Sequence, residues 1–234
     1  MDRRNQRVLV FGTGVSGIGA ADLLIAEGAR VLLYDGNDKQ DPEQILAKLK
    51  KRDGAEVALG ALPMEELGKL DLAVLSPGVP TDLPEVLALK ERIPVWGEVE
   101  LAYQASQGTV LAITGTNGKT TTTALLGQIM RDARDSVFVV GNIGTPYTSA
   151  ALAMGPDTVA VAEISSFQLE TIQEFHPQVS AILNITEDHL DRHHTMEEYI
   201  RVKEQICRNQ TGEDTVVLNY EDEILREFGQ AVQA

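Results

Sequence analysis

The sequence is poor in cysteine and has no long apolar run. Its one cysteine, Cys207, excludes an internal disulfide framework and is ordinary in a reducing compartment. No apolar run approaches the ~20 residues that a bilayer-spanning helix needs. The opening residues 1–7 are polar and lead at once into a short strand-like run, which is unlike a signal peptide. We therefore expect a cytoplasmic protein that has no membrane partner.

Positive charge is also scarce, because 20 Lys and Arg stand against 35 Asp and Glu, for a formal net charge of −15. Nucleic-acid surfaces depend on clustered Lys and Arg, so this composition argues against a nucleic-acid partner. If the protein handles anionic substrates, the neutralising charge must be local. Backbone N–H groups, single lysines and metal ions are the candidates.

The 234 residues, 43% of them hydrophobic, suffice for two medium domains. Apolar strands alternate with helical segments throughout, which predicts an α/β fold with parallel sheets covered on both faces. We place the boundary at Ile93-Pro94, because Pro94 disfavours helix at the residue before it. Residues 1–93 and residues 94–234 are each expected to form one α/β domain.

The expected elements follow from periodicity, glycine and proline. In the first domain they are strands 7–11, 30–34 and 72–75, and helices 18–26, 42–51 and 84–91. In the second domain they are strands 110–113, 137–140, 158–162, 179–183 and 215–218, with helices starting near Lys119, Thr145, Thr195 and Glu221.

Residues 112–123 predict a phosphate-binding turn between a buried strand and a helix. Gly115 and Gly118 allow a tight turn of bare N–H groups, Lys119 adds a positive charge, and the Thr120 hydroxyl suits Mg²⁺. The pattern G-x-x-x-x-G-K-[ST] would place its first glycine at Ile113, so the glycine is displaced. The alternative is a turn without a ligand, but we expect a nucleoside triphosphate.

A second glycine motif, Gly12-x-Gly14-x-x-Gly17, follows the first strand, and Asp35 ends the second strand. Alone it would suggest NAD, since it matches the dinucleotide fingerprint. With a triphosphate motif later in the chain, another nucleotide diphosphate fits better, and glycines needed only for packing are the alternative. Ser76-Pro77-Gly78-Val79-Pro80 lies where open α/β sheets bind ligands, although it could equally be a rigid turn.

Polar residues follow two strands of the second domain. Glu163 ends one strand on the same edge as the phosphate turn, and could complete a Mg²⁺ shell with Thr120. His189 follows the next strand and is a candidate metal ligand. His193 and His194 are expected on the surface. Lysines on amphipathic helices are mostly solvated, so spacing alone does not select Lys203.

Four motifs in order resemble the Mur ligases of peptidoglycan synthesis, and the displaced glycine is that family's form. They are residues 115–121, 141–144, 163–170 and 184–191. Within the family, the glycine-rich start, residues 76–80 and the Ser-Ser-Phe-Gln-Leu-Glu stretch resemble the members that add D-glutamate to UDP-N-acetylmuramoyl-L-alanine. Another Mur-type ligase is the alternative within the family, and folylpolyglutamate synthases usually have Gly-Lys-Gly-Ser where this chain has Gly-Lys-Thr-Thr.

The resemblance implies a role for each matching residue. Lys119, His189 and Lys203 would act in catalysis, and Lys119 would also bind ATP. Thr120 and Glu163 would hold one Mg²⁺, and His189 with Lys203 as a carbamate would hold a second. Further ATP contacts would come from Gly115, Thr116, Asn117, Gly118 and Thr121. UDP-substrate contacts would come from Gly14, Val15, Ser16, Asp35, Ser76, Pro77, Gly78, Asn142, Ser165 and Gln168. ATP would phosphorylate the alanine carboxylate, and the D-glutamate amine would attack the acyl phosphate.

The resemblance implies a Rossmann-like UDP-substrate-binding domain over residues 1–93 and a P-loop-type ATP-binding domain over residues 94–234. The family is longer than this chain, so we expect a truncated central domain, no C-terminal ligase domain, and a fragment that is inactive alone. A UDP-sugar or nucleotide-binding module without catalysis is the main alternative from another class. A P-loop ATPase or GTPase switch ranks last, because the sequence gives no sign of a switch loop.

Overall fold

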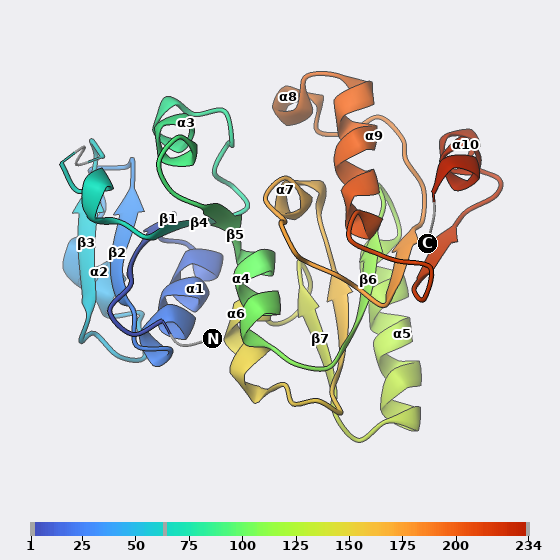
Figure 1. Ribbon diagram of the computed structural model, residues 1–234, viewed down its shortest axis with the longest axis horizontal. Coiled ribbons are helices and arrows are strands. Elements are labelled where there is room, and N and C mark those ends of the chain that lie inside the picture. The colour runs from blue at the N-terminus through green and yellow to red at the C-terminus, as the bar shows by residue number, and fades with distance from the viewer. Residues whose placement is uncertain (1–2, 63–64, 233–234) are drawn as a thin grey trace. The chain divides into compact units, whose positions relative to one another are not determined.

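The computed structural model describes residues 3–62 and 65–232, which fall into two compact α/β units, one up to Ala105 and one from Ser106 onward (Figure 1). Each unit is built on a five-stranded sheet whose neighbouring strands are all parallel. The predicted α/β class with parallel sheets is therefore confirmed. Within the described ranges, no helix has both the length and the apolar character needed to cross a bilayer.

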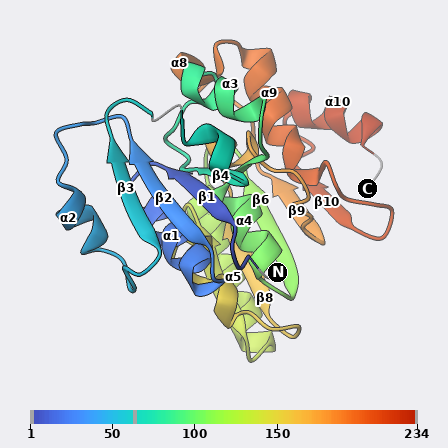
Figure 2. The ribbon, with the colours of Figure 1, turned by 60° about the vertical axis from the view of Figure 1, so that its left-hand side comes forward.

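The first unit has the strand order β3-β2-β1-β4-β5, seen for its first four strands in Figure 2. Its strands are β1 (Arg7–Phe11), β2 (Arg30–Asp35), β3 (Ala55–Leu59), β4 (Leu72–Leu75) and β5 (Val95–Gly97). Its helices are α1 (Val15–Ala26), α2 (Pro42–Leu46), η1 (Leu67–Lys69), α3 (Pro84–Lys90) and α4 (Glu98–Ala105). The chain changes direction across the sheet between β1 and β4, where open α/β sheets bind ligands.

Both faces of the first sheet are buried, as the continuous apolar strands require. On one face, alternate residues of the strands join the side chains of α3 in a single apolar core: Leu9, Phe11, Leu32, Tyr34, Ala73, Leu75, Val86 and Leu89. On the other face α1 packs against β1 and β2, and α4 packs against β4 and β5.

The first unit extends beyond the boundary expected between residues 93 and 94. β5 pairs with β4 in parallel, with Val95 opposite Ala73, so the segment after Pro94 completes the first sheet. The predicted helix over 42–51 is shorter, because α2 ends at Leu46. β3 was not predicted. It lies at the sheet edge and is only partly buried, so its residues do not alternate clearly between apolar and polar.

The second unit has the strand order β10-β9-β6-β8-β7, with β6 in the centre. Its strands are β6 (Thr109–Thr114), β7 (Val137–Gly141), β8 (Val159–Glu163), β9 (Val179–Ile182) and β10 (Thr215–Leu218). Its helices are α5 (Lys119–Ala133), α6 (Tyr147–Ala150), η2 (Ala151–Ala153), α7 (Ser166–Leu169), α8 (Leu190–His193), α9 (Met196–Glu204), η3 (Gln205–Cys207) and α10 (Glu223–Ala231).

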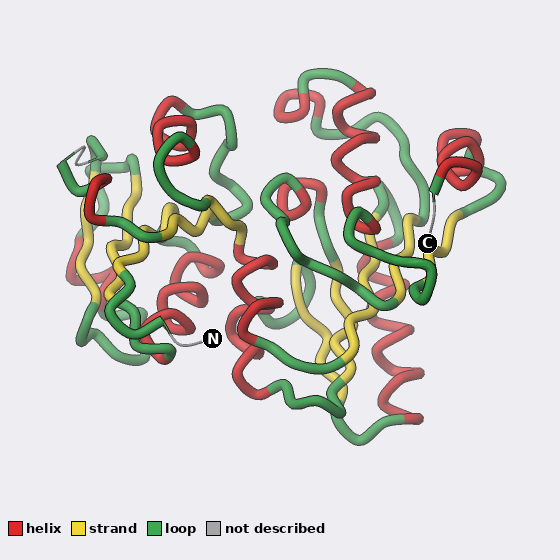
Figure 3. Tube along the Cα trace, in the orientation of Figure 1, coloured by secondary structure: helices red, strands yellow, loops and turns green. Residues whose placement is uncertain are grey.

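The second sheet brings four loops to its carboxyl edge. α5 covers β6, β7 and β8 on one face, over an apolar core that includes Ile113, Val159 and Val161. The loops after β6, β7, β8 and β9 leave the same edge, because all of these strands are parallel. Figure 3 shows these loops as green segments that follow the yellow strands.

Candidate functional site

The phosphate loop, residues 115–118, joins β6 to α5 and needs glycine at two positions. Gly115 and Gly118 have φ values of +147° and +83°, a region that other residues rarely adopt. A Cβ on Gly115 would also lie 3.1 Å from Leu183 Cβ, so a larger residue would strain the contact with the loop after β9. Gly118 caps α5, whose first N–H groups have no partner within the helix.

Asn184, in the loop after β9, holds the phosphate loop in place. Its carbonyl accepts from Thr116 N at 2.9 Å. Its side chain accepts from Asn117 N at 2.8 Å and donates to Asn117 O at 3.0 Å. These three bonds use both the backbone and the amide of one residue, which fixes the loop before any ligand binds. The sequence indicated only a polar loop here, and the clamp was not predicted.

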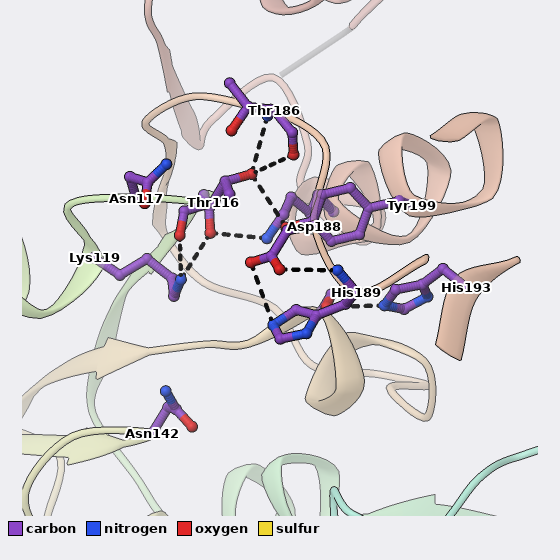
Figure 4. A network of polar contacts seen from close by, with 12 residues as sticks. Thr116, Asn117, Lys119, Asn142, Thr186, Asp188, His189, His193 and Tyr199 are labelled. Atoms are coloured by element: carbon purple, nitrogen blue, oxygen red, sulfur yellow. Dashed lines mark hydrogen bonds and ion pairs between the residues drawn. The ribbon is translucent and has the colours of Figure 1, made fainter. Parts of the chain in front are cut away.

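Lys119 lies inside the curve of the phosphate loop. Its Nζ donates to the carbonyl oxygens of Gly115 and Thr116, both at 2.9 Å (Figure 4). The ammonium group is therefore held against the loop by two of the loop's own carbonyl groups. Thr120 and Thr121 follow in the first turn of α5 and are exposed.

Glu163 is a buried carboxylate at the end of β8 with one unpaired oxygen. The residue is 1% exposed, and Oε1 accepts from Asn142 Nδ2 at 2.9 Å. Oε2 is buried and has no hydrogen-bond partner. Asn142 N also donates to the Glu163 carbonyl at 2.9 Å, which joins the loop after β7 to β8. An unpaired buried carboxylate oxygen is costly, and a cation at this edge would compensate it.

Lys203 is buried, contrary to the expectation of a solvated helix lysine. It is 1% exposed, and its Nζ donates to the Gly115 carbonyl at 2.8 Å and lies 4.7 Å from the centre of the Tyr199 ring. Burial, with a smaller effect from Lys119, lowers the pKa of Lys203 to about 7, although Asp188 opposes the shift. A large share of this amine is therefore neutral at physiological pH.

Tyr199 links α9 to the phosphate loop and was not predicted as a site residue. Its hydroxyl lies 3.1 Å from Thr116 Oγ1, which also contacts Thr186 O at 3.1 Å and Thr186 N at 3.0 Å (Figure 4). Burial raises the pKa of Tyr199, so the phenol stays protonated and can donate. Its spacing of one helical turn from Lys203 was the only sequence signal for this role.

His189 lies at the same edge and is half-exposed. Its φ of +52° is left-handed, and its Nε2 lies 3.4 Å from Asp188 Oδ2. Its ring packs against Phe167 at a centroid distance of 5.0 Å. Figure 4 shows His189 and Asp188 beside the labelled residues of the phosphate loop. The predicted residues Lys119, Glu163, His189 and Lys203 therefore all belong to the second unit: Glu163 ends β8, Lys119 starts α5, His189 precedes α8 and Lys203 lies on α9.

The expectation that His193 lies on the surface is wrong. His193 is 2% exposed, whereas His194 is exposed as predicted. α8 is a single turn that folds back onto α7 and α9, so its last residue points into the unit. Periodicity could not predict this, because four residues are too few to define a buried face.

Ser165 and Gln168 form the capping box of α7. Ser165 Oγ accepts from Gln168 N at 3.3 Å, and Gln168 Oε1 accepts from Ser165 N at 2.9 Å. Gln168 is buried, so this pair has a structural role in the described residues. Any contact of these two residues with a substrate remains a prediction.

In the first unit the glycine turn between β1 and α1 is closely packed. Gly12 has a φ of +105°, and a Cβ on Gly17 would lie 1.8 Å from the Gly12 carbonyl oxygen. A Cβ on Gly14 would meet nothing within 4 Å. Val15 is 76% exposed and Ser16 is partly buried. Gly14 therefore leaves an open approach to the backbone, whereas Gly12 and Gly17 are needed for packing.

Asp35 and Ser76 flank this glycine turn. Asp35 accepts from Thr13 Oγ1 at 2.7 Å and from Asn37 N at 3.0 Å. Burial pushes the pKa of Asp35 up, but these hydrogen bonds outweigh it and the net pKa is lowered, so Asp35 is a carboxylate at neutral pH. Ser76 N donates to Phe11 O at 2.9 Å, and Ser76 Oγ is buried without a partner. Pro77 and Gly78 follow on the loop.

No three His, Cys, Asp or Glu side chains converge to hold a metal ion in the part of the chain that the structure describes. A cation at the second unit's edge would need other ligands beside Glu163, such as a hydroxyl, a modified lysine or phosphate oxygens.

Two family models match the chain. The Mur ligase middle domain matches residues 113–234, and the Mur ligase MurD-like N-terminal domain matches residues 6–97.

Curated relatives align with the whole chain. The UDP-N-acetylmuramoylalanine--D-glutamate ligase of Lachnospira eligens is 57% identical, and the protein of the same name from Lachnoclostridium phytofermentans is 55% identical. Each alignment covers 100% of this chain and 52% of the relative, so the chain spans about half the length of these relatives.

Solved structures share the fold. The UDP-N-acetylmuramate:L-alanyl-gamma-D-glutamyl-meso-diaminopimelate ligase from Neisseria meningitides superposes with a TM-score of 0.63 at 18% identity. The match covers 98% of this chain and 76% of the solved chain. At this identity the likeness concerns the fold alone.

Proposed function

The chain belongs to the Mur ligase family, and from that premise we propose that it carries the UDP-substrate and ATP sites of a D-glutamate-adding ligase. The reaction would join D-glutamate to UDP-N-acetylmuramoyl-L-alanine through an acyl phosphate, with ATP as the phosphate donor. The names of the relatives that are 55–57% identical support this assignment. The observation that carries it is the hydrogen bond from the buried Lys203 to the phosphate loop at Gly115.

The phosphate loop and Lys119 would hold the ATP phosphates. Asn184 already uses the N–H groups of Thr116 and Asn117, so the phosphates would be held mainly by the N–H groups at the N-terminus of α5. Lys119 adds the positive charge that an acidic chain must supply locally. Gly115, Thr116, Asn117, Gly118 and Thr121 are the proposed neighbours of the phosphates. During transfer, Lys119 would offset the negative charge that accumulates on the transferred group.

The residues present fit Mg²⁺. Glu163 offers a buried oxygen without a partner, and Thr120 offers an exposed hydroxyl in the first turn of α5. We assign these two side chains to one Mg²⁺, and His189 with a carbamate of Lys203 to a second. When bound, the ions would neutralise charge on phosphate and carboxylate oxygens.

Lys203 is suited to become a carbamate. Its neutral amine would attack CO₂, the Nζ–C bond would form and a proton would leave, so that a cation is replaced by an anionic oxygen ligand. The pKa of about 7 supplies the neutral amine, and burial limits competition from water. One N–H remains on the carbamate nitrogen, so the bond to the Gly115 carbonyl can persist.

The first unit would bind the UDP end of the substrate. The open backbone at Gly14 to Ser16 suits the diphosphate, and the carboxylate of Asp35 is an acceptor for the base or sugar. Ser76 to Gly78 lie beside the turn and are proposed to contact the same part of the substrate; the Ser76 hydroxyl is buried and has no partner. Asn142, Ser165 and Gln168 are proposed to contact the remainder of the substrate.

The ATP site is tested by titrating the chain with ATP in the presence and absence of Mg²⁺. We expect binding that depends on Mg²⁺ and that weakens at least about tenfold in Lys119→Ala, because one charge-assisted phosphate contact is lost. Steady ATP hydrolysis without either substrate would contradict the proposal and favour a nucleotide switch.

A further inference from the structure

Behind the proposed metal ligands lies a buried histidine to which the proposed mechanism gives no task. His193 ends α8, is 2% exposed and contacts residues of both α7 and α9. We propose that His193 is a positioning residue, which sets His189 through Phe167 and Lys203 through Tyr199. This inference rests on the proposed function, because it takes His189 and Lys203 as the ligands to be positioned.

The first connection passes through Phe167 on α7. The His193 ring lies 5.5 Å from the Phe167 ring, and Phe167 lies 5.0 Å from the ring of His189. The Arg192 guanidinium covers Phe167 at 5.0 Å from the ring centre. Phe167 is therefore held by three side chains of one short segment, and a shift of His193 would move the surface on which His189 rests.

The second connection passes through Tyr199 on α9. The ring centroids of His193 and Tyr199 are 5.2 Å apart, and the Lys203 ammonium lies over Tyr199 at 4.7 Å. The Tyr199 hydroxyl is tied to Thr116 Oγ1 at 3.1 Å. The Tyr199 ring therefore lies between His193 and the Lys203 ammonium group, and its hydroxyl is fixed to the phosphate loop. A change at His193 would shift this ring, and with it the position of Lys203.

His193 has one strong anchor and one weak anchor. Nε2 is hydrogen-bonded to Ser166 Oγ at 3.0 Å, whereas Nδ1 lies 3.4 Å from Glu170 Oε1, which is a longer polar contact. Arg192 holds the same carboxylate, with Nε 3.2 Å from Oε1 and Nη2 2.6 Å from Oε2. A neutral ring that accepts from Ser166 at Nε2 carries its proton on Nδ1, on the side of Glu170.

The Ser166, His193 and Glu170 arrangement has the order of a nucleophile, base and carboxylate. The Ser166 hydroxyl is buried and already paired with His193 Nε2 at 3.0 Å, and the proposed mechanism gives it no reacting atom. His193 therefore acts only through the neighbouring rings of Phe167 and Tyr199, which makes it a positioning residue.

Three variants separate positioning from packing. His193→Phe keeps a ring between Phe167 and Tyr199 but removes both anchors. His193→Gln keeps a polar group near Ser166 but removes the ring. Ser166→Ala removes one anchor with the smallest change of volume, so it keeps the test possible if a His193 variant does not fold. His176→Gln is the control, since His176 pairs with Asp214 at 2.6 Å in loops that precede β9 and β10.

Two measurements on the 234-residue chain decide the matter: the Mg²⁺ concentration for half-maximal ATP binding, and the carbamate signal of Lys203 in ¹³C NMR with ¹³C-bicarbonate. We expect both His193 variants to need about tenfold more Mg²⁺ and to lose most of the carbamate signal, with a smaller effect in Ser166→Ala. His176→Gln should change neither. Wild-type values in all the folded variants would overturn the positioning role.

The same data distinguish this inference from the proposed function. If the unaltered chain has neither Mg²⁺-dependent ATP binding nor a carbamate signal, the proposed function fails and His193 has no ligands to position. If the unaltered chain has both and the variants keep them, only the positioning role fails.

Discussion

Lys203 Nζ donates a hydrogen bond to the Gly115 carbonyl at 2.8 Å, across 88 residues of sequence. The bond joins α9 to the phosphate loop and brings a fully buried lysine to the edge of the second sheet. Lys119 donates to the same carbonyl, so two lysines share one acceptor. Their mutual repulsion adds to the burial that lowers the pKa of Lys203 to about 7.

Replacing Lys203 separates its chemistry from its packing. In Lys203→Met a side chain of similar shape replaces a buried charge, so we expect the free energy of unfolding to fall by less than about 1 kcal/mol or to rise. Mg²⁺-dependent ATP binding should weaken at least about tenfold, because the proposed second metal ion loses a ligand. Urea denaturation and calorimetry measure the two effects, and unchanged ATP binding would remove Lys203 from the site.

Glu163→Gln should also leave the fold intact while damaging the site. Asn142 can still donate to the amide oxygen, and the unpaired buried charge on Oε2 disappears. We therefore expect equal or higher stability without Mg²⁺, and a smaller gain in melting temperature when Mg²⁺ and ATP are added. If the variant gains as much from Mg²⁺ and ATP as the unaltered chain, Glu163 does not hold the ion.

Two glycines of the first unit form a matched pair. In Gly17→Ala the new methyl would lie 1.8 Å from the Gly12 carbonyl oxygen, which should cost at least about 1–3 kcal/mol of stability. In Gly14→Ala nothing lies within 4 Å, so stability should change by less than about 1 kcal/mol.

Gly14→Ala should nevertheless weaken binding of UDP-N-acetylmuramoyl-L-alanine, since a methyl group would stand between the backbone and the diphosphate. Thermal melts and titration of this variant test the assignment. If Gly14→Ala and the unaltered chain bind UDP-N-acetylmuramoyl-L-alanine with equal affinity, the diphosphate does not bind at Gly14.

The pH dependence of stability reports on His193. Burial lowers its pKa, with further lowering by Arg192, His189 and Lys203, and with Glu170 acting in the opposite direction. As the pH falls, His193 therefore takes up a proton near pH 6.5 in the unfolded chain, and only at a lower pH in the folded chain. The stabilising effect of a neutral His193 is present above pH 6.5 and is lost as the pH falls through the lowered value.

Urea denaturation from pH 8 to pH 5 measures this effect as a difference between the unaltered chain and His193→Gln. The two stabilities should run in parallel above pH 7 and converge below pH 6.5, because only the unaltered chain loses this contribution. If the two plots of unfolding free energy against pH stay parallel from pH 8 to pH 5, His193 has the same pKa in the folded and unfolded chains, which contradicts the prediction.

Local sequence predicted much of the fold and, in each unit, the glycine-rich turn that forms part of the candidate site. The turns after β1 and β6 could be located because glycines stand next to a helix start in both, and a lysine follows the glycines in the second. The positions of β1, β4 and β10 were predicted without error. β5 and α4 were not assigned to the first unit, because that depends on the pairing of Val95 with Ala73 across the sheet.

The parts that could not be predicted depend on contacts between distant segments. The burial of Lys203 follows from the packing of α9 against the phosphate loop, and spacing within α9 contains no such information. The Asn184 clamp and the burial of His193 likewise arise where separate loops meet at one sheet edge. The resemblance to a family selected Lys203, and the structure supplies the physical reason for its altered pKa.

Calorimetric titration of the chain with UDP-N-acetylmuramoyl-L-alanine, and separately with NAD, tests the central claim most directly. The ligase assignment predicts one binding site for the UDP-substrate, an affinity at least about tenfold weaker in Asp35→Ala, and no binding of NAD. Binding of NAD in place of the UDP-substrate would contradict the assignment and identify the glycine turn as a dinucleotide site.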